Sequence, residues 1–349
     1  MHWEKHILDH STTIKEALFS LDALGQDTML FVRDEKKKLI GALTDGDIRR
    51  GLLNGITLDD PVIKTCNKTP HFIVHNEQYI LKLRSYREKK LKMIPVVNDN
   101  NEIIDIINFR LSKSKLPVDV VIMAGGKGKR LRPLTNNTPK PLLKVGSKPI
   151  IEHLIDQLSY YGMNHIKLSI KYLGEQIEQF AQQKSHENLK ISSFWDNDEL
   201  GTIGSLKLIT DLNKNYILVC NSDLLTNVDY EKFFFDFIEN DVDLSVLSIP
   251  YTVNIPYAVL KLNENRVINL KEKPSYTYYS NGGMYLMKKE VLDLIPDGVK
   301  YSATDLLGKL IELNKKVRSY QHEGYWLDIG RIDDYNKANK DIASGKIKK

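Results

Sequence analysis

Four short apolar segments in the first third of the chain form two similar pairs. Residues 29–33 and 39–43 are apolar and are separated by a polar turn, which is typical of an antiparallel strand pair. Residues 93–97 and 103–107 repeat this pattern, and both segments lie 64 positions further along. The constant offset predicts an internal repeat made of two similar structural units.

A helix is predicted before each strand pair. Thr13 and Glu16 have the spacing of a capping box. Apolar residues then follow at helical spacing: Ile14, Ala17, Leu18 and Leu21. The second helix is expected at about residues 77–89. Because each unit is too small to bury a core alone, we expect the two units to pack face to face.

The pattern changes after the polar, proline-terminated segment 113–117, which we interpret as a linker. Residues 118–123 are almost continuously apolar, as in a strand covered on both faces. Pro149 opens a helical pattern that Gly162 closes. More strands are predicted at 166–170, 190–194, 216–220 and 243–249, and antiparallel ones at 257–262, 267–271 and 283–287. This order predicts an α/β domain with a mostly parallel sheet at 118–349, preceded by a smaller α+β domain at 1–112.

Composition narrows the class of protein. The chain has 349 residues, of which 42% are hydrophobic and 27% charged, and its net charge is +5. No apolar run approaches the roughly 18–20 residues of a membrane span, and two cysteines, Cys66 and Cys220, are too few for a disulfide framework. We therefore expect a cytoplasmic protein without a membrane or nucleic-acid partner, whose mild positive charge suits a small anionic substrate.

The most informative segment is the glycine-rich turn after residues 118–123. It contains Gly125, Gly126 and Gly128, and without side chains their backbone N–H groups can approach anionic oxygens closely. Several cations lie beside it: Lys127, Lys129, Arg130, Arg132 and Lys140. Pro139 and Pro141 stiffen the backbone around Lys140. A triphosphate, with about four negative charges, matches this turn chemically.

A plain structural alternative is a tight strand-to-helix turn with a solvated basic face. The combination of glycines, arginine and a rigid Pro-Lys-Pro after a buried strand favours phosphate binding instead. The turn contains neither the Gly-x-x-x-x-Gly-Lys-Ser/Thr pattern of a Walker A loop nor the Gly-x-Gly-x-x-Gly pattern of dinucleotide-binding proteins.

The segment Gly-Gly-Lys-Gly-Lys-Arg-Leu-Arg-Pro-Leu-Thr at 125–135 and the following Pro-Lys-Pro-Leu at 139–142 resemble the signature of sugar nucleotidyltransferases. Lys129 stands where that family usually has threonine. The resemblance covers about residues 118–340 and implies a Rossmann-like, GT-A-like core. It also implies transfer of a nucleotidyl group from a nucleoside triphosphate to a sugar 1-phosphate, with release of pyrophosphate.

Two carboxylates are candidate metal ligands. Asp223 follows the predicted strand 216–220, and Asp328 lies in Trp-Leu-Asp-Ile-Gly. Reaction between two anions calls for a cation such as Mg²⁺, and by resemblance these aspartates match the family's metal ligands. A turn or cap for Asp223 and a lysine partner for Asp328 are the structural alternatives. The resemblance further implies that Arg130 and Lys140 hold the triphosphate.

Base and sugar contacts are also implied by resemblance. The residues assigned to the nucleotide are Ala124, Gly125, Gly126, Gly128, Glu199, Gly201 and Thr202. Those assigned to the sugar phosphate are Glu272, Lys273, Asn281 and Gly283, with Lys273 also as a catalytic cation. An ordinary helix start at Thr202 and a solvated strand end at residues 271–273 are the alternatives. Ala258 replaces a glycine that the family often has, which weakens the detailed match on the sugar side.

Residues 1–112 resemble a tandem pair of cystathionine-β-synthase (CBS) domains, through the paired strands and the segment Gly-Ala-Leu-Thr-Asp-Gly-Asp-Ile at 41–48. The Thr-x-x-Asp of that family commonly holds the ribose of an adenosine ligand, which matches Thr44 and Asp47. The second repeat has Asn108 and Leu111 there. One adenine-nucleotide site is therefore expected at most, and a purely dimerising or supporting role is the alternative.

The sequence thus predicts an enzyme, a sugar-1-phosphate nucleotidyltransferase that most resembles guanylyltransferases acting on hexose, hexosamine or heptose 1-phosphates. Thymidylyl, uridylyl and cytidylyl transfer remain open. So does a non-catalytic nucleotide-sensing scaffold, although the retained charged residues disfavour it. RNA binding through the basic turn is disfavoured because aromatic residues are not interleaved with its lysines. A homo-oligomer is expected.

Overall fold

The computed structural model describes residues 3–75, 79–196 and 200–347. It divides the chain into two compact units, Met1–Lys115 and Leu116–Lys349. The boundary falls within the segment 113–117 that the sequence marks as a linker.

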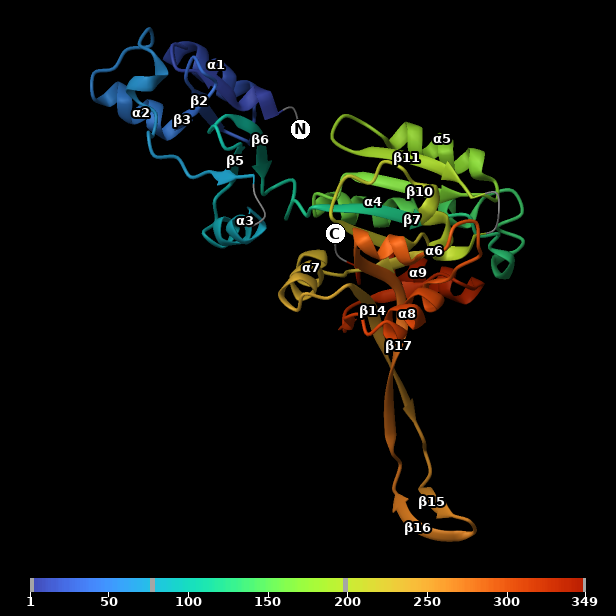
Figure 1. The fold of residues 1–349 in the computed structure, drawn as a ribbon. Coiled ribbons are helices and arrows are strands. Elements are labelled where there is room, and N and C mark those ends of the chain that lie inside the picture. Colours follow the sequence, from blue (N-terminus) through green and yellow to red (C-terminus); the bar gives the residue numbers. More distant parts are fainter. Residues whose placement is uncertain (1–2, 76–78, 197–199, 348–349) are drawn as a thin grey trace. The chain divides into compact units, whose positions relative to one another are not determined.

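The N-terminal unit consists of two three-stranded sheets with helices beside them (Figure 1). The first sheet contains β1 (Ile7–Asp9), β2 (Met29–Arg33) and β3 (Leu39–Thr44), and the second contains β4 (Ile73–Val74), β5 (Met93–Val97) and β6 (Ile103–Asn108). The helices are α1 (Ile14–Ala23), α2 (Asp45–Leu53) and α3 (Tyr79–Glu88). The predicted strand pairs and helices are therefore confirmed, and Thr13 and Glu16 form the expected capping box on α1.

The two repeats share a hydrophobic core. Phe31, Leu39 and Ala42 of the first repeat cluster with Met93 and Val97 of the second. The backbone N–H of Leu39 also donates to the carbonyl of Asn101 at 2.9 Å. The expectation that the two repeats pack against each other is therefore confirmed. Neither β-pair could bury its apolar face alone.

The C-terminal unit is built on a seven-stranded sheet in the order β11-β10-β7-β12-β17-β14-β18. Its strands are β7 (Val118–Met123), β10 (His165–Ile170), β11 (Lys190–Trp195), β12 (Tyr216–Asn221), β14 (Leu244–Asn254), β17 (Ser275–Lys288) and β18 (Val317–Gln321). Neighbouring strands are parallel except where β17 pairs with β12 and with β14. The sheet is mostly parallel, as the sequence predicts.

The centre of this sheet is buried on both faces. Val120, Val121 and Ile122 of β7 have no exposed surface, because helices cover the sheet on each side. The unit's helices are α4 (Ile150–Tyr160), α5 (Gly174–Lys184), α6 (Gly201–Gly204), α7 (Tyr230–Glu239), α8 (Ala303–Glu312) and α9 (Ile332–Ala343). Among the helices of the described residues, none has the length and apolar character needed to cross a bilayer.

Three small strand pairs complete the unit. They are β8 (Lys144–Val145) with β9 (Lys148–Pro149), β13 (Leu224–Thr226) with β19 (Trp326–Asp328), and β15 (Val259–Asn263) with β16 (Arg266–Lys271). The pairing of β13 with β19 is the one that matters for the site, since it sets Leu224 opposite Asp328.

A long hairpin leaves the central sheet. β14 and β17 continue to pair beyond the sheet, and β15 and β16 lie at the far end of this projection (Figure 1). Leu247 is buried at the root, whereas residues 250–254 are exposed. We call residues 249–281 the arm. The antiparallel strands predicted at 257–262 and 267–271 are confirmed as its end.

Candidate active site

A pocket of about 410 Å³ opens where β7, β10 and β12 end. Its lining residues are Met123, Gly125, Gly126, Gly128, Lys129, Arg130, Lys140, Pro141, Ser169, Lys171, Asp196, Gly201, Thr202, Asn221, Ser222, Asp223 and Gly330. Ligands of open α/β sheets bind at this edge because the loops after parallel strands meet there. The register of β7 and β12, with Met123 opposite Asn221, brings the glycine-rich turn and the Asp223 loop to the same place.

The glycine-rich turn forms one wall of the pocket. Gly128 has φ +55°, and a Cβ there would meet Cγ2 of Thr135 at 3.0 Å and Cβ of Lys140 at 3.1 Å. Glycine is therefore required by both conformation and space. Ala124 was also assigned to the nucleotide, but it is not among the residues that line the pocket. It is buried, and its N–H donates to the carbonyl of Ser169 at 2.9 Å. Its position anchors the start of the turn.

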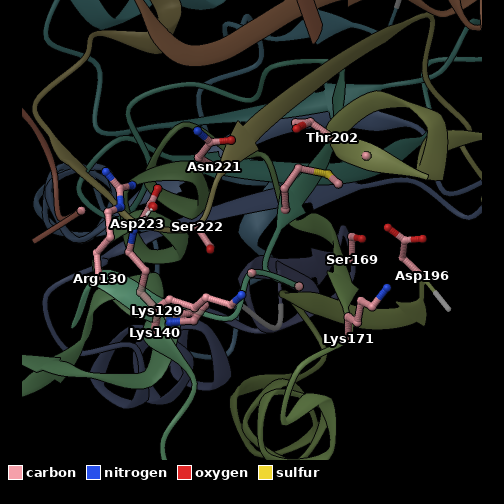
Figure 2. A pocket seen from close by; sticks show the side chains of 17 residues that line it. Lys129, Arg130, Lys140, Ser169, Lys171, Asp196, Thr202, Asn221, Ser222 and Asp223 are labelled. Atoms are coloured by element: carbon pink, nitrogen blue, oxygen red, sulfur yellow. Dashed lines mark hydrogen bonds and ion pairs between the residues drawn. The ribbon is translucent and has the colours of Figure 1, made fainter. Parts of the chain in front are cut away.

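Cations and carboxylates meet on one side of the pocket. Figure 2 shows Lys129, Arg130, Lys140 and Asp223 gathered there. Lys140 lies on a short 3₁₀ turn, Lys140–Leu142, that Pro139 precedes. Its ammonium forms an ion pair with Asp223 and lies 3.8 Å from Oδ1 of Asp328. The three side chains predicted to act together, from segments almost 200 residues apart, are thus brought together.

The two aspartates are placed by backbone pairing. The N–H of Ile329 donates to the carbonyl of Asp223 at 3.1 Å, next to the β13–β19 pair. Burial raises the pKa of Asp328, and the negative charge of Asp223 adds to this, while Lys140 and Arg130 lower it. Two adjacent carboxylates that share a single lysine therefore favour a further cation between them.

The pair fits a divalent metal ion. Oδ1 of Asp223 and Oδ1 of Asp328 are both buried, and neither has a hydrogen-bond partner among the residues that the structure describes. Within the described ranges there is no group of three or more His, Cys, Asp or Glu side chains that could hold a metal. Two carboxylates with open positions suit Mg²⁺, which takes its other ligands from water and substrate phosphates.

The opposite side of the pocket has a different character. Figure 2 shows Ser169, Lys171 and Asp196 there, at the ends of β10 and β11. Oδ1 of Asp196 accepts from the N–H of Leu200 at 3.2 Å. The sequence reasoning did not identify these three residues. The sequence could have indicated them only through their position. Each lies at the end of a strand that is parallel to β7, or just after it, and therefore reaches the same edge of the sheet.

The helix start at Gly201 brings backbone against this side. Gly201 has φ +79°, and a Cβ there would meet the carbonyl oxygen of Tyr301 at 2.9 Å. Gly201 and Thr202 line the pocket as expected. The helix expected to start at Thr202 is the short α6, which begins one residue earlier, at Gly201, and has no side-chain cap. Glu199, which was also assigned to the nucleotide, lies outside the described residues.

Comparison with known proteins identifies this architecture. The family model described as Nucleotidyl transferase matches residues 119–345. The chain belongs to the nucleotidyl transferase family. The matched segment contains the whole pocket and ends just beyond α9.

The names of similar proteins refer to different nucleotide bases. The chain is 30% identical to the D-glycero-alpha-D-manno-heptose 1-phosphate guanylyltransferase of Aneurinibacillus thermoaerophilus, over 64% of this chain and 98% of that protein. It is 27% identical to the UTP–glucose-1-phosphate uridylyltransferase of Synechocystis sp., over 65% of this chain and 64% of that protein. The solved structure of HddC from Yersinia pseudotuberculosis complexed with GMP-PN has a TM-score of 0.50 and 27% identity, and the match covers 64% of this chain and 99% of that one.

The sugar-side residues expected in a nucleotidyl transferase divide into two groups. Gly283 lies at the edge of the pocket, since a Cβ there would meet Nδ2 of the lining residue Asn221 at 2.7 Å. Asn281 is close by and accepts from the N–H of Gly283 at 2.9 Å. Glu272 and Lys273 are exposed on the arm and do not line the pocket. The sequence could not show this, because the continued pairing of β14 with β17 carries them away from their own pocket.

A second pocket, of about 750 Å³, lies in the N-terminal unit. It is lined by Gln26–Met29 and Thr44–Gly46 of the first repeat and by Lys90–Met93 and Asn108–Arg110 of the second. The offset of 64 carries the first set of residues onto the second, so the pocket lies between equivalent segments of the two repeats.

Of the two residues assigned to a ligand in this unit, only Thr44 lines the pocket. Oδ2 of Asp47 accepts from the N–H and hydroxyl of Thr44 at 2.9 and 2.6 Å, which closes a capping box on α2. Oδ1 of Asp47 accepts from Arg50. Asp47 thus caps α2, and its assignment as a ribose contact stays a prediction.

Proposed function

We propose that this protein transfers a nucleotidyl group from a nucleoside triphosphate to a sugar 1-phosphate and releases pyrophosphate. One observation carries the proposal: Arg130 and Lys140 lie beside the glycine-rich turn on one side of a single pocket, where Lys140 meets the carboxylates of Asp223 and Asp328. The cations of such a site neutralise phosphates, and the carboxylates can hold a metal ion. Membership of the nucleotidyl transferase family supports the same reaction class.

The reaction needs positioning and charge neutralisation. A phosphate oxygen of the sugar 1-phosphate bonds to the α-phosphorus, and the bond from that phosphorus to the β-phosphate oxygen breaks, so that pyrophosphate leaves. Arg130 and the amides of the turn hold the β- and γ-phosphates and stabilise the leaving group. Lys140 holds the α-phosphate. No general base is required, because the attacking phosphate is already an anion.

Mg²⁺ is proposed as the cofactor, with Asp223 and Asp328 as its protein ligands. When bound, it would screen the negative charge on the α-phosphate. Their two buried oxygens without hydrogen-bond partners support this assignment. Lys140 would then be released from Asp223 and turn its ammonium to the substrate.

Guanine is the base we propose. Its Watson–Crick edge presents adjacent N–H donors, which a carboxylate accepts in a bidentate manner. Asp196 offers such a carboxylate on the side of the pocket opposite the phosphate-binding cations. The guanylyltransferase relative and the HddC complex with GMP-PN support this choice, whereas the uridylyltransferase relative keeps a pyrimidine as the second candidate.

For the N-terminal unit we propose a CBS-type pair that binds an adenine nucleotide and regulates turnover. The pocket between its repeats, lined by Thr44 and flanked by Lys90, Lys92 and Arg110, suits a phosphorylated ligand. The protein is proposed to act in the cytoplasm.

A substrate matrix tests the proposed reaction. Five nucleoside triphosphates are combined with several hexose, hexosamine and heptose 1-phosphates in the presence of Mg²⁺, and pyrophosphate is measured. We expect release only when both substrates are present, and fastest release with GTP. Repeating the best pair with AMP and ATP tests regulation. Absence of release from every pair would support the alternative of a nucleotide-sensing scaffold.

A further inference from the structure

The arm exposes an unusual amount of apolar surface. Ten of its large hydrophobic side chains are exposed, although it contains only residues 249–281. They are Tyr251, Val253, Tyr257, Leu260, Leu262, Val267, Ile268, Leu270, Tyr278 and Tyr279. A two-stranded hairpin with no further support is at best marginally stable in water. The arm therefore calls for a surface to pack against.

The two faces of the stem, where β14 pairs with β17, differ in polarity. On one face Thr252 and Thr277 are opposite each other and share a hydrogen bond at 3.0 Å, next to the pair Pro250 and Tyr279. Since side chains alternate along a strand, the pair Tyr251 and Tyr278 lies on the other face, together with Val253. This second face is the more apolar of the two.

The end of the arm also has apolar side chains gathered on one face. Leu260 pairs with Leu270, and Leu262 pairs with Val267, so these four side chains share one face of the β15–β16 hairpin. Together with the three apolar side chains of the stem they present on the order of 700 Å² at roughly 100 Å² each. Each partner in a standard protein interface contributes about 800 Å². The surface is thus large enough for a specific interface.

The straight course of the ladder holds Lys273 away from the pocket of its own chain. Lys273 is eight residues before Asn281, which corresponds to about 26 Å of extended strand. That distance is far beyond the reach of a lysine side chain. The pairing is continuous from Ile249–Ser280 to Asn254–Ser275, and docking on another molecule requires no change in it.

We propose that the arm docks on a second copy of this chain and delivers Glu272 and Lys273 to the sugar-phosphate side of that copy's pocket. The second part rests on the proposed function. Exchange of an identical element is a low-cost route to a symmetric dimer, because each arm serves the other molecule. Lys273 has φ +40°, a backbone conformation that is unfavourable for a lysine.

Mixed dimers test the delivery. Asp223→Ala and Lys273→Ala chains are co-expressed with different affinity tags and purified through both tags. Each mixed dimer then has one site with neither substitution, so we expect about half of the wild-type turnover. Pairs in which both chains carry the same substitution are expected to be inactive. Inactive mixed dimers beside an active wild type would overturn the proposal and place the arm on its own pocket.

A crosslinking experiment tests the docking without any activity. The exposed Tyr257 is replaced by the photocrosslinker p-benzoylphenylalanine in the full chain. We expect covalent dimers of about twice 40.1 kDa, with crosslinked peptides from the rim of the partner's pocket. Crosslinks confined to one chain, to another region of the second copy or to a different protein would contradict the proposal. Dimers from a wild type without turnover would refute the proposed function alone.

A matched pair of substitutions locates the interface on the arm. Leu270→Asp places a charge on the apolar face, whereas Asn269→Asp adds the same charge one residue away on the opposite face. We expect Leu270→Asp to reduce the yield of the Tyr257 crosslink at least tenfold and Asn269→Asp to leave it unchanged. Equal yields from both variants would show that the apolar face is not the docking surface.

Discussion

At the scale of single residues, the site depends on the balance between its positively and negatively charged side chains. Asp223 and Asp328 share Lys140 as a counterion, and burial together with the charge of Asp223 raises the pKa of Asp328. The motif was sufficient to propose Arg130, Lys140 and both aspartates as site residues, because each lies in a short characteristic segment. It did not reveal Asp196, which no local pattern distinguishes from other acidic residues.

Asp196→Asn tests how the base is recognised. The amide replaces one accepting oxygen with a donor, which opposes the N–H groups of guanine. A bidentate contact is worth about 1–3 kcal/mol, so we expect KM for GTP to rise roughly 5–150-fold. Initial rates with GTP and UTP provide the measurement.

Asp297→Asn is the matched control for this change, since Asp297 is 87% exposed and does not line the pocket. We expect it to leave KM unchanged. An Asp196→Asn variant with unaltered base preference would remove the case for guanine recognition by this residue.

At the scale of elements, local patterns predicted most strands and helices, since alternation and capping are properties of short segments. They could not predict where β14 and β17 lead, because the course of a long hairpin depends on what covers it. The short strands β13 and β19 were also not predicted, since three residues carry too little pattern. Their pairing is nevertheless what brings Asp223 and Asp328 together.

The capping boxes of the N-terminal unit provide a matched pair of variants. Thr13 caps α1 and Thr44 caps α2 in the same way, but Thr44 also lines the pocket of this unit. We expect Thr13→Ala and Thr44→Ala each to lower the free energy of unfolding by about 1 kcal/mol, because each removes a cap. Urea denaturation measures this loss. Only Thr44→Ala should also weaken AMP binding in a calorimetric titration, and equal binding by both variants would place the nucleotide elsewhere.

One contribution to acid stability comes from Asp241, an exposed residue just after α7. Hydrogen bonds from Lys288 and Lys316 lower the pKa of Asp241 to about 2. Since this pKa is lower in the folded state, the ion pairs stabilise the fold above the unfolded value of about 3.9, and that contribution is lost as the pH falls towards 2. We expect Asp241→Asn to reduce the loss of stability between pH 4 and pH 2. Denaturation curves at several pH values measure it, and identical slopes for both proteins would contradict this role.

At the scale of the whole molecule, the chain combines a repeat-built N-terminal unit with a nucleotidyl transferase unit. Each has its own hydrophobic core and its own pocket. The sequence indicated this organisation because the strand pattern changes from paired repeats to a parallel α/β order. It could not indicate the exposed arm, which we propose docks on a second copy of the chain.

Separate expression tests the independence of the two units. We expect residues 116–349 to fold and to keep turnover within about threefold of the full chain, because the pocket and the arm both belong to this unit. Any response to AMP or ATP should be lost. Circular dichroism and pyrophosphate release check the fragment. A folded but inactive fragment would show that the N-terminal unit is needed for catalysis.

Pyrophosphate release by the wild type and by Asp223→Asn is the most direct test of the central claim, that a cationic turn and two carboxylates join two phosphate-bearing substrates. The wild type should release pyrophosphate only with triphosphate, sugar 1-phosphate and Mg²⁺ together. Asp223→Asn should retain the fold, as seen by circular dichroism, and lose at least about 100-fold in turnover. Undiminished turnover by a folded Asp223→Asn protein would contradict the account.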